Sequence, residues 1–435
     1  MMREPLSLLE KHVLVLGLGD TGLSAARWVE RQGGRVRVAD TRGSPPRKQE
    51  FGGDLRSGPF RETLLEGIDF VCISPGLSLE EEIIRHARAL NIPVIGDIEL
   101  FAWHNTAKVI AVTGTNGKST VSALAGHLLR AAGVDCEVAG NIGPPVLDAL
   151  MKRTKLPEAW VLELSSYQLE TTRSLAPAAA AMLNLTEDHF DRYAGLEEYA
   201  AAKARVFMGG GVQVLNRDDP RSLAMALPGR KVVTFGLDAP RGDDFGVAEG
   251  KLVQGRSEIL PVGELAIRGS HNVANALAAC ALISGFAETF SQGLKTFKGL
   301  PHRLQLVATR RGVEWYDDSK GTNVGATVAA LRGLGRKSVL ILGGEGKGQD
   351  FSPLKEAAAR HAVRVLLIGR DAPLIAKVVP GEHCSSLEDA VQRAAETAKT
   401  GEVVLLSPAC ASFDMFRDYR HRGEAFAAAV KRLAP

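Results

Sequence analysis

The sequence lacks any long apolar run. No stretch approaches 18 uninterrupted apolar residues, and the amino-terminal segment MMREPLSLLEKHVLVLG contains none before its first strand-like residues. A membrane-spanning helix needs about 20 consecutive apolar residues, and a secretory signal needs an apolar segment near the amino terminus. The sequence therefore predicts a protein without a membrane span that stays in the cytoplasm.

Cysteine is scarce and scattered. The chain has five cysteines, an odd number, and no two of them have C-x-x-C spacing: Cys72, Cys136, Cys280, Cys384 and Cys410. A disulfide framework or a zinc site needs paired or clustered cysteines. Free thiols fit the reducing cytosol.

Aromatic residues are also few, and the net charge is small. Aromatic side chains make up 6% of the chain and the net charge is +3, with basic residues spread along the sequence. Proteins that bind nucleic acid concentrate Lys and Arg on one face, with aromatic side chains among them. The sequence therefore predicts small anionic ligands and no nucleic-acid partner.

The length and the rhythm of the chain indicate several α/β domains. A chain of 435 residues is too long for one ordinary hydrophobic core. Short β-branched runs alternate with helical patterns, as expected for parallel α/β sheets. We expect strands at His12–Leu16, Val36–Ala39, Phe70–Ser74, Val109–Val112, Trp160–Leu164, Ala181–Leu185, Val339–Leu342, Val365–Ile368 and Val403–Leu406.

We place domain boundaries near Gly96 and near Leu300. The first precedes the segment DIELFAWHNTAK, which we expect to restart a strand, and the second precedes GLPHR. The fold class predicted is α/β with three domains: Rossmann-like at 1–96, P-loop ATPase-like at 97–300 and Rossmann-like at 301–435. Residues 209–269 are rich in Gly, Pro and short strands, so we expect extra β structure in the middle domain.

A glycine-rich loop follows the strand that begins at Val109. The loop VTGTNGKST leads into the helical segment SALAGHLL, and this context presents backbone N–H groups to phosphates at a helix amino terminus. Lys118 would reach the β and γ phosphates, and Ser119 would offer its hydroxyl to Mg²⁺. Val112 stands where the usual motif has its first glycine. A helix start capped by Ser and Thr is the alternative, but Gly-Lys-Ser-Thr directly after a strand favours phosphate binding.

A second glycine-rich loop spans residues 17–22, GLGDTG, with Asp40 at the end of the next strand. This pattern is a dinucleotide fingerprint, but the same turn receives any pyrophosphate. We keep the phosphate prediction and set aside nicotinamide. Glycines needed only for tight packing of the turn are the alternative.

Thirteen motifs resemble one family over nearly the whole chain. They are GLGDTGLS (17–24), SPGL (74–77), GDIELF (96–101), TGTNGKST (113–120), GNIG (140–143), LELSSYQLE (162–170), LNLTEDHFDRY (183–193), AAK (201–203), HNVAN (271–275), GLPHR (299–303), DDSKGTN (317–323), GGEGKGQDF (343–351) and SPACASFDMF (407–416). Together they resemble the Mur ligases of peptidoglycan synthesis, whose phosphate loop is shortened in the same way. The SSYQLE and SPACASFD runs are similar to those of the members that add D-glutamate.

The resemblance implies a reaction, cofactors and partners. ATP would phosphorylate the carboxylate of UDP-N-acetylmuramoyl-L-alanine, and the amino group of D-glutamate would attack the acyl phosphate to form an amide. The resemblance implies ATP, two Mg²⁺ ions and a carbamate on a lysine, which would be Lys203 here. We expect a monomer.

The resemblance also implies the site residues. Lys118, Glu163, His189 and Lys203 would be catalytic, and Ser119, Glu163, His189 and Lys203 would hold the metal ions. ATP would be bound by Gly114, Thr115, Asn116, Gly117, Lys118, Ser119, Thr120, Asn141, Asn275, Arg303 and Asp318. The UDP substrate would be bound by Gly19, Thr21, Asp40, Thr41, Ser74, Gly76, Asn141 and Ser165, and D-glutamate by Lys320, Thr322, Lys347, Ser412 and Tyr419.

Several of these residues have ordinary structural alternatives. From the residues alone, His189 would be a hydrogen-bonded structural histidine and Lys203 a solvated helix lysine. Tyr419 stands where the family often has Phe, and Asp20 places an acid inside a turn that would face a diphosphate.

Three other functions remain as alternatives. An oxidoreductase would rest on the 17–22 loop and Asp40 alone and would leave Lys118 and Lys203 without roles. A non-catalytic nucleotide-binding regulator would not need the catalytic positions, none of which is lost. A sister amide ligase, such as another Mur ligase or a folylpolyglutamate synthase, would share the ATP core but lack SSYQLE.

Overall fold

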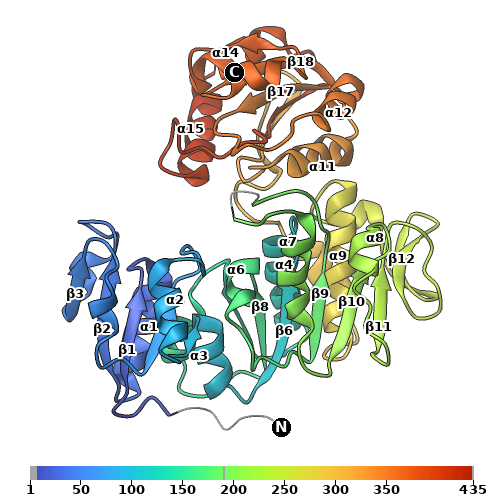
Figure 1. Cartoon of the computed structure of the whole chain (residues 1–435). Coiled ribbons are helices and arrows are strands. Elements are labelled where there is room, and N and C mark those ends of the chain that lie inside the picture. The colour runs from blue at the N-terminus through green and yellow to red at the C-terminus, as the bar shows by residue number, and fades with distance from the viewer. Residues whose placement is uncertain (1–6, 190–191, 434–435) are drawn as a thin grey trace.

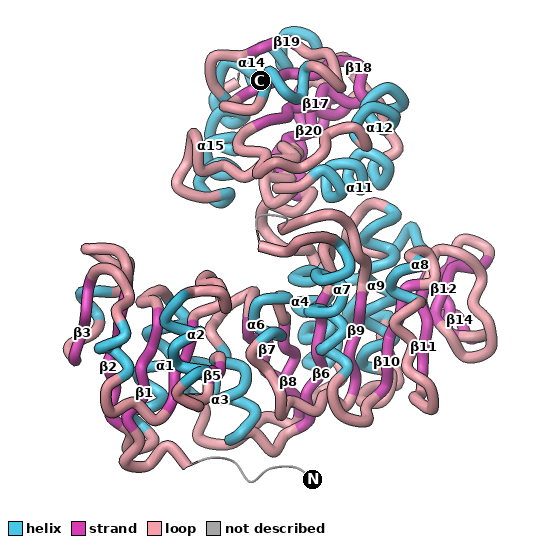
Figure 2. The backbone as a smooth tube through the Cα atoms, in the orientation of Figure 1, coloured by secondary structure: helices cyan, strands magenta, loops and turns pink. Residues whose placement is uncertain are grey.

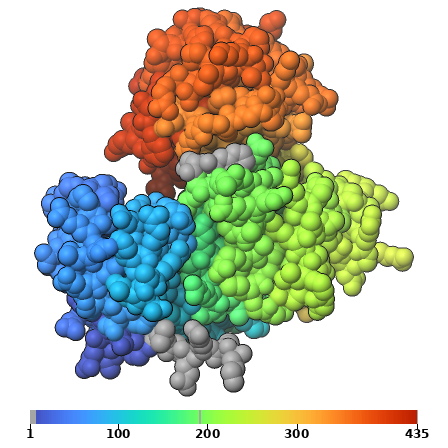
Figure 3. Space-filling model, viewed as in Figure 1, coloured from blue at the N-terminus to red at the C-terminus, as the bar shows by residue number. Residues whose placement is uncertain are grey.

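The computed structural model describes residues 7–189 and 192–433, which form three α/β domains around three separate sheets (Figure 1). The ends of the predicted first and third domains and residues 190–191 of the TEDHFDRY motif lie outside the described residues. The N-terminal and central domains lie side by side, and the C-terminal domain is seated above them (Figure 3).

The N-terminal domain has a five-stranded parallel sheet in the order β3-β2-β1-β4-β5. Its elements are β1 (His12–Leu16), α1 (Asp20–Arg31), β2 (Arg35–Asp40), β3 (Asp54–Ser57), β4 (Phe70–Ile73), α2 (Glu82–Ala89) and β5 (Val94–Ile95). The strand order reverses between β1 and β4, where the glycine-rich loop joins β1 to α1. Ligands of open parallel sheets bind at such a reversal. The Rossmann-like prediction is confirmed.

The segment after Gly96 does not restart a strand. Asp97–His104 forms helix α3, and the strand β6 (Lys108–Thr113) begins only afterwards. Helix α3 packs on α1 and on α5 (Val146–Lys152), and the Phe101 ring meets that of Trp160 edge to face at 5.1 Å. The first two domains consequently share one continuous hydrophobic cluster.

The central domain has a nine-stranded sheet in the order β14-β13-β12-β11-β10-β9-β6-β8-β7. Its remaining strands are β7 (Cys136–Gly140), β8 (Ala159–Glu163), β9 (Ala179–Met182), β10 (Val212–Asn216), β11 (Val232–Phe235), β12 (Phe245–Ala248), β13 (Lys251–Gln254) and β14 (Ser257–Pro261). Its main helices are α4 (Lys118–Ala131), α6 (Ser166–Glu170), α7 (Leu196–Ala204), α8 (Pro220–Leu223), α9 (Ser270–Ile283) and α10 (Ser291–Thr296). Strands β12 to β14 are antiparallel and form the extra β structure that the sequence predicts (Figure 2).

Strand β9 lies earlier than predicted. It ends at Met182, and Leu183–Leu185 belongs to a loop that runs beside the phosphate loop. There the backbone N–H of Asn116 donates to Oδ1 of Asn184 at 2.8 Å. The polar side chain of Asn184 is used to hold the neighbouring loop, so the apolar residues around it do not extend the strand.

The C-terminal domain has a six-stranded sheet in the order β15-β16-β20-β17-β18-β19, with β15 antiparallel at one edge. Its strands are β15 (Gln305–Arg310), β16 (Val313–Asp317), β17 (Ser338–Gly343), β18 (Ala362–Ile368), β19 (Glu382–His383) and β20 (Val403–Leu406). Its helices are α11 (Val324–Leu334), α12 (Leu354–His361), α13 (Ala372–Ala376), α14 (Leu387–Thr397) and α15 (Tyr419–Arg432). This domain has its own hydrophobic clusters and meets the central domain through the contact of α11 with α9 (Figure 1).

None of the helices in the described part of the chain has the length and apolar character needed to cross a lipid bilayer.

Candidate active site

The phosphate loop joins β6 to α4, as the motif predicts, but α4 begins at Lys118, earlier than the predicted helical segment SALAGHLL. Gly117 has φ +85°, and a Cβ atom there would lie 2.5 Å from Oδ1 of Asn275. Only glycine suits this position, because a side chain would be strained and would collide with α9. The first turn of α4 thus opens onto a cavity of about 730 Å³ whose lining includes Lys118 and Ser119. The free backbone N–H groups of this first turn suit an anion.

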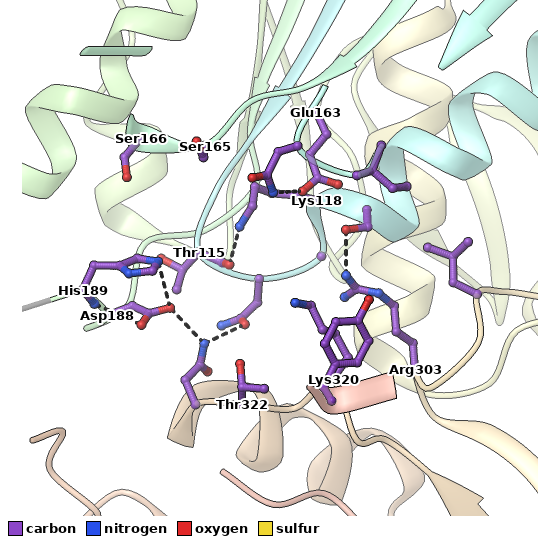
Figure 4. Close-up of a pocket in the computed structure, with 18 of the residues that line it drawn as sticks. Thr115, Lys118, Glu163, Ser165, Ser166, Asp188, His189, Arg303, Lys320 and Thr322 are labelled. Carbon is purple, nitrogen blue, oxygen red and sulfur yellow. Dashed lines mark hydrogen bonds and ion pairs between the residues drawn. The ribbon is translucent and has the colours of Figure 1, made fainter. Parts of the chain in front are cut away.

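Two lysines share one backbone acceptor behind this loop, and Figure 4 shows one of them, Lys118, pointing toward the backbone at Thr115. Lys118 Nζ donates to the carbonyl oxygens of Gly114 and Thr115, each at 2.8 Å, and Lys203 Nζ donates to the same Gly114 oxygen at 2.8 Å. Lys203 is 1% exposed, so the alternative of a solvated helix lysine is wrong. Burial, and then the charge of Lys118, lower the pKa of Lys203 well below its ordinary value. Lys203 is therefore suited to being a neutral amine.

Glu163 ends β8 beside the phosphate loop and is 1% exposed. Its Oε1 accepts from Nδ2 of Asn141 at 2.6 Å, whereas its Oε2 has no hydrogen-bond partner among the described residues. A buried carboxylate oxygen without a partner is costly unless a ligand satisfies it. The Ser119 hydroxyl lies in the same cavity and accepts from Arg303 at 2.6 Å.

These groups fit a magnesium ion bound together with phosphates. The described residues contain no cluster of three or more His, Cys, Asp or Glu side chains that could hold a metal alone. Mg²⁺ on a nucleotide commonly takes only one or two protein ligands besides phosphate oxygens. The unpartnered oxygen of Glu163 and the hydroxyl of Ser119 are groups of the kind that could serve as such ligands.

His189 lies in the loop after β9, and its Nδ1 is 2.7 Å from the hydroxyl of Tyr167. Its Nε2 is 3.8 Å from Oδ2 of Asp188. Burial lowers the pKa of His189, which favours the neutral imidazole that binds metals. Tyr167 fixes the ring from one side and leaves Nε2 facing the cavity that Asp188 also lines.

The predicted UDP residues of the N-terminal domain line a second cavity of about 540 Å³. Those residues are Gly19, Thr21, Asp40, Thr41, Ser74 and Gly76. Asp40 accepts from the N–H of Leu18 at 2.7 Å and from the guanidinium of Arg42, and the latter lowers the pKa of Asp40 to about 2. Asp40 therefore holds the glycine-rich loop in shape.

A third cavity, of about 330 Å³, lies between α9 and the C-terminal domain. The predicted ATP residues Thr120, Asn275 and Asp318 line it, together with Asn116, Gly117 and Arg303, which also line the central cavity. Burial raises the pKa of Asp318 to about 7. The shared residues make the third cavity continuous with the phosphate loop.

The C-terminal domain supplies cations to the central cavity. Lys320, Thr322, Lys347 and Tyr419 line it, and Lys320 Nζ lies 4.2 Å above the Tyr419 ring. Burial, followed by the nearby charge of Arg303, lowers the pKa of Lys320 to about 8. Ser412 is the exception among the predicted residues of this domain, because it is 2% exposed and lines none of the three cavities.

Sequence reasoning missed several residues of the site. Nδ2 of Asn323 reaches both Oδ1 of Asn116 and Oδ2 of Asp188 at 3.2 Å and so ties the C-terminal domain to the phosphate loop. Tyr199 places its ring 4.6 Å from Lys203 Nζ. Asn323 and Asp188 stand inside quoted motifs, DDSKGTN and LNLTEDHFDRY, whereas Tyr199 stands outside them, four residues before Lys203.

A phosphate loop between two Rossmann-like domains, with one cavity opening toward each, defines a multidomain nucleotide-binding enzyme. Three family models match the chain in order: "Mur ligase MurD-like, N-terminal domain" at residues 11–96, "Mur ligase middle domain" at 112–283 and "Mur ligase, glutamate ligase domain" at 302–410. The chain belongs to the Mur ligase family.

Curated relatives match over almost the full length. The chain is 53% identical to a UDP-N-acetylmuramoylalanine--D-glutamate ligase of Thiobacillus denitrificans, covering 99% of this chain and 98% of the relative. It is 52% identical to the protein of the same name from Nitrosospira multiformis, covering 98% and 97%. Among solved structures, UDP-N-acetylmuramate-alanine ligase MurC of Thermotoga maritima aligns with a TM-score of 0.62 at 18% identity, covering 97% and 99%, which supports the shared fold.

Proposed function

We propose that this protein is an ATP-dependent amide ligase that joins D-glutamate to UDP-N-acetylmuramoyl-L-alanine through an acyl phosphate, in peptidoglycan precursor synthesis. The observation that carries the proposal is that the central cavity at the phosphate loop shares lining residues with each of the other two cavities. Asn141 lines both the central and the N-terminal cavity, and Arg303 lines both the central and the third cavity. Relatives at about half identity over the full chain bear the name of this activity.

Each predicted domain would bring one reactant. Residues 1–96 would hold the uridine diphosphate end of the substrate, residues 97–300 would hold ATP, and residues 301–435 would hold the amino acid. Asn275 would contact adenine, and Arg303 and Asp318 would lie near the ribose and phosphates. Ser165, which caps α6 and lines the central cavity, would contact the muramoyl part.

The cations of the site balance three anionic reactants. Lys118 and the first turn of α4 hold the ATP phosphates and orient the γ phosphate toward the alanyl carboxylate. Lys320, Lys347 and Thr322 would bind the carboxylates of D-glutamate and bring its amino group to the activated carbonyl. Ser412 receives no support from the cavity geometry for this role.

Two Mg²⁺ ions fit the remaining groups. Ser119 and Glu163 would hold one of them, and His189 and a carbamate on Lys203 the other. When bound, Mg²⁺ neutralises the charge of the phosphates and of the attacked carboxylate. The neutral Nζ of Lys203 can attack the carbon of CO₂ and lose a proton, which converts an uncharged amine into an anionic oxygen ligand that suits Mg²⁺.

The residues that we assign to the three substrates come from all three domains of one chain, and we keep the monomer as the proposed state. ATP and nucleotide-activated sugars occur in the cytoplasm, so we propose that the protein acts there.

The test is a substrate panel. The purified protein is incubated with ATP, Mg²⁺, UDP-N-acetylmuramoyl-L-alanine and one amino acid at a time, and both phosphate release and product mass are measured. We expect product with D-glutamate well above that with L-glutamate, L-alanine or meso-diaminopimelate. Equal product with any of these three would overturn the assignment to D-glutamate.

A further inference from the structure

The cavity of the N-terminal domain is short of available positive charge. Among the described residues that line it, the acidic side chains are Asp20 and Asp40 and the basic ones are Arg42 and Arg420. Arg42 is committed to Asp40, with hydrogen bonds of 2.8 and 2.7 Å. A diphosphate bound in this cavity would therefore be held more strongly with a further cation beside it.

Arg420 is the cation available, and it comes from another domain. It is the second residue of α15, which lies on the side of the C-terminal domain above the N-terminal domain (Figure 1). Its side chain is exposed, its Nε donates to the hydroxyl of Tyr419 at 3.3 Å, and no carboxylate forms an ion pair with it within the described residues.

Arg420 also stands where two cavities join. Asn141, Ile142 and Arg420 line both the central cavity and the N-terminal cavity. A nucleotide sugar with its uridine in the N-terminal cavity and its carboxylate beside Lys118 must pass through this junction. The part of such a molecule between uridine and carboxylate is the diphosphate and the sugar.

We propose that Arg420 binds the diphosphate of the nucleotide-sugar substrate, so that the C-terminal domain takes part in recognising a ligand of the N-terminal domain. The inference rests on the proposed function and adds a residue to its substrate site. Asp20 lines the same cavity, and its carboxylate is paired with Arg47 at 2.6 Å and does not cap α1. The negative charge of Asp20 then repels the diphosphate and weakens its binding.

The competing arrangement is an ion pair between Arg420 and Asp20 across the two domains. Asp20 is near enough to contribute to the raised pKa of Arg420, after the larger contributions of Tyr419 and Asp418. The two arrangements make opposite predictions for Asp20→Asn. If Arg420 binds the diphosphate, removing the acid strengthens binding; if Arg420 needs Asp20, removing the acid weakens it.

The test is equilibrium binding of UDP-N-acetylmuramoyl-L-alanine by titration calorimetry, with the full chain and without ATP. Arg420→Gln should weaken binding about tenfold, as expected for loss of one charge-assisted hydrogen bond. Arg420→Lys should keep part of the affinity, and its dependence on ionic strength should exceed that of Arg420→Gln. Arg417→Gln is the matched control, because Arg417 is exposed just before α15 and lines none of the three cavities.

These measurements distinguish binding of the diphosphate by Arg420 from an ion pair between Arg420 and Asp20. Weaker binding by Arg420→Gln, unchanged binding by Arg417→Gln and tighter binding by Asp20→Asn support the inference. Equal affinity of Arg420→Gln and the wild type overturns it, and so does an Asp20→Asn variant that binds as weakly as Arg420→Gln. A wild-type chain that does not bind the nucleotide sugar at all would overturn the proposed function itself.

Discussion

The side-chain nitrogen of Lys203 lies 2.8 Å from the carbonyl oxygen of Gly114, the same oxygen to which Lys118 donates at 2.8 Å. Two ammonium groups sharing one acceptor in a buried site would repel each other strongly. Neutralising Lys203 removes that repulsion and leaves Lys118 as the cation for the phosphates. The geometry thus makes a carbamate on Lys203 chemically reasonable, because CO₂ adds only to the neutral amine.

Replacing Lys203 tests this role. Lys203→Ala should lower kcat by about 10²-fold or more, because the site loses an oxygen ligand and the electrostatic stabilisation that depends on it. Adding a short-chain carboxylate such as formate should restore part of the rate. The measurement is phosphate release with and without formate, and Lys155→Ala, which removes an exposed lysine, is the control. Wild-type turnover by Lys203→Ala would remove the carbamate from the mechanism.

The hydroxyl of Tyr167 orients His189, so its removal should act through the metal. Tyr167→Phe should raise the Mg²⁺ concentration for half-maximal activity about tenfold, as expected when a partner of a metal-bound histidine is lost. Tyr193→Phe is the matched control: its hydroxyl donates to Glu170 in the same aromatic cluster and does not reach His189. If both variants had the same Mg²⁺ requirement, Tyr167 would have only a packing role.

The pH dependence of D-glutamate use should reflect Lys320. Its pKa is lowered to about 8 by burial, so its positive charge is present below pH 8 and is lost above it. We expect kcat/KM for D-glutamate, which reports the free enzyme, to fall as pH rises through about 8. Lys320→Arg should move that fall to higher pH, because arginine stays protonated. A wild-type profile that is flat from pH 7 to 9.5 would exclude Lys320 as a charged contact.

The buried carboxyl of Asp97 should make the stability of the protein depend on pH. It is 2% exposed at the start of α3, it accepts from Nε2 of Gln168 at 3.1 Å, and burial raises its pKa from 3.8 to about 6. A carboxyl whose folded-state pKa lies above its unfolded value costs stability once it ionises. Asp97→Asn should therefore stabilise the protein by about 3 kcal/mol at pH 8, and this gain should shrink as the pH falls toward 4.

Urea unfolding of both proteins at pH 8 and pH 4 measures this difference. Glu82→Gln is the control, because it removes an exposed acid from the first position of α2. A stabilisation by Asp97→Asn that is equal at both pH values would show that ionisation of Asp97 is not the cause.

Local patterns predicted much of the fold. The runs His12–Leu16 and Val403–Leu406 are strands with the predicted bounds, and a helix follows the phosphate loop as predicted, because buried parallel strands and the phosphate loop have strong local signatures. That helix, α4, begins at Lys118, before the predicted segment SALAGHLL. The prediction for residues 97–104 was wrong, because we expected this segment to restart a strand and it forms helix α3. Its apolar residues pack on α1 and α5, so its conformation depends on contacts with other elements.

Contacts between distant residues set the rest of the site. The bond of Tyr167 to His189 and the bond of Asn323 to Asp188 join separate segments of the chain and, in the second case, separate domains. No spacing within one segment encodes such pairs. The burial of Lys203 could not be predicted either, because the segment EEYAAAKARVF alone is that of a solvated helix.

The most direct test of the proposed reaction follows one oxygen atom. UDP-N-acetylmuramoyl-L-alanine labelled with ¹⁸O in its alanyl carboxylate is incubated with the protein, ATP, Mg²⁺ and D-glutamate, and the released phosphate is analysed by mass spectrometry. Phosphorylation of the carboxylate, followed by attack of the amino group, transfers one ¹⁸O to each phosphate, and this is the predicted result. Unlabelled phosphate accompanying amide formation would contradict the account.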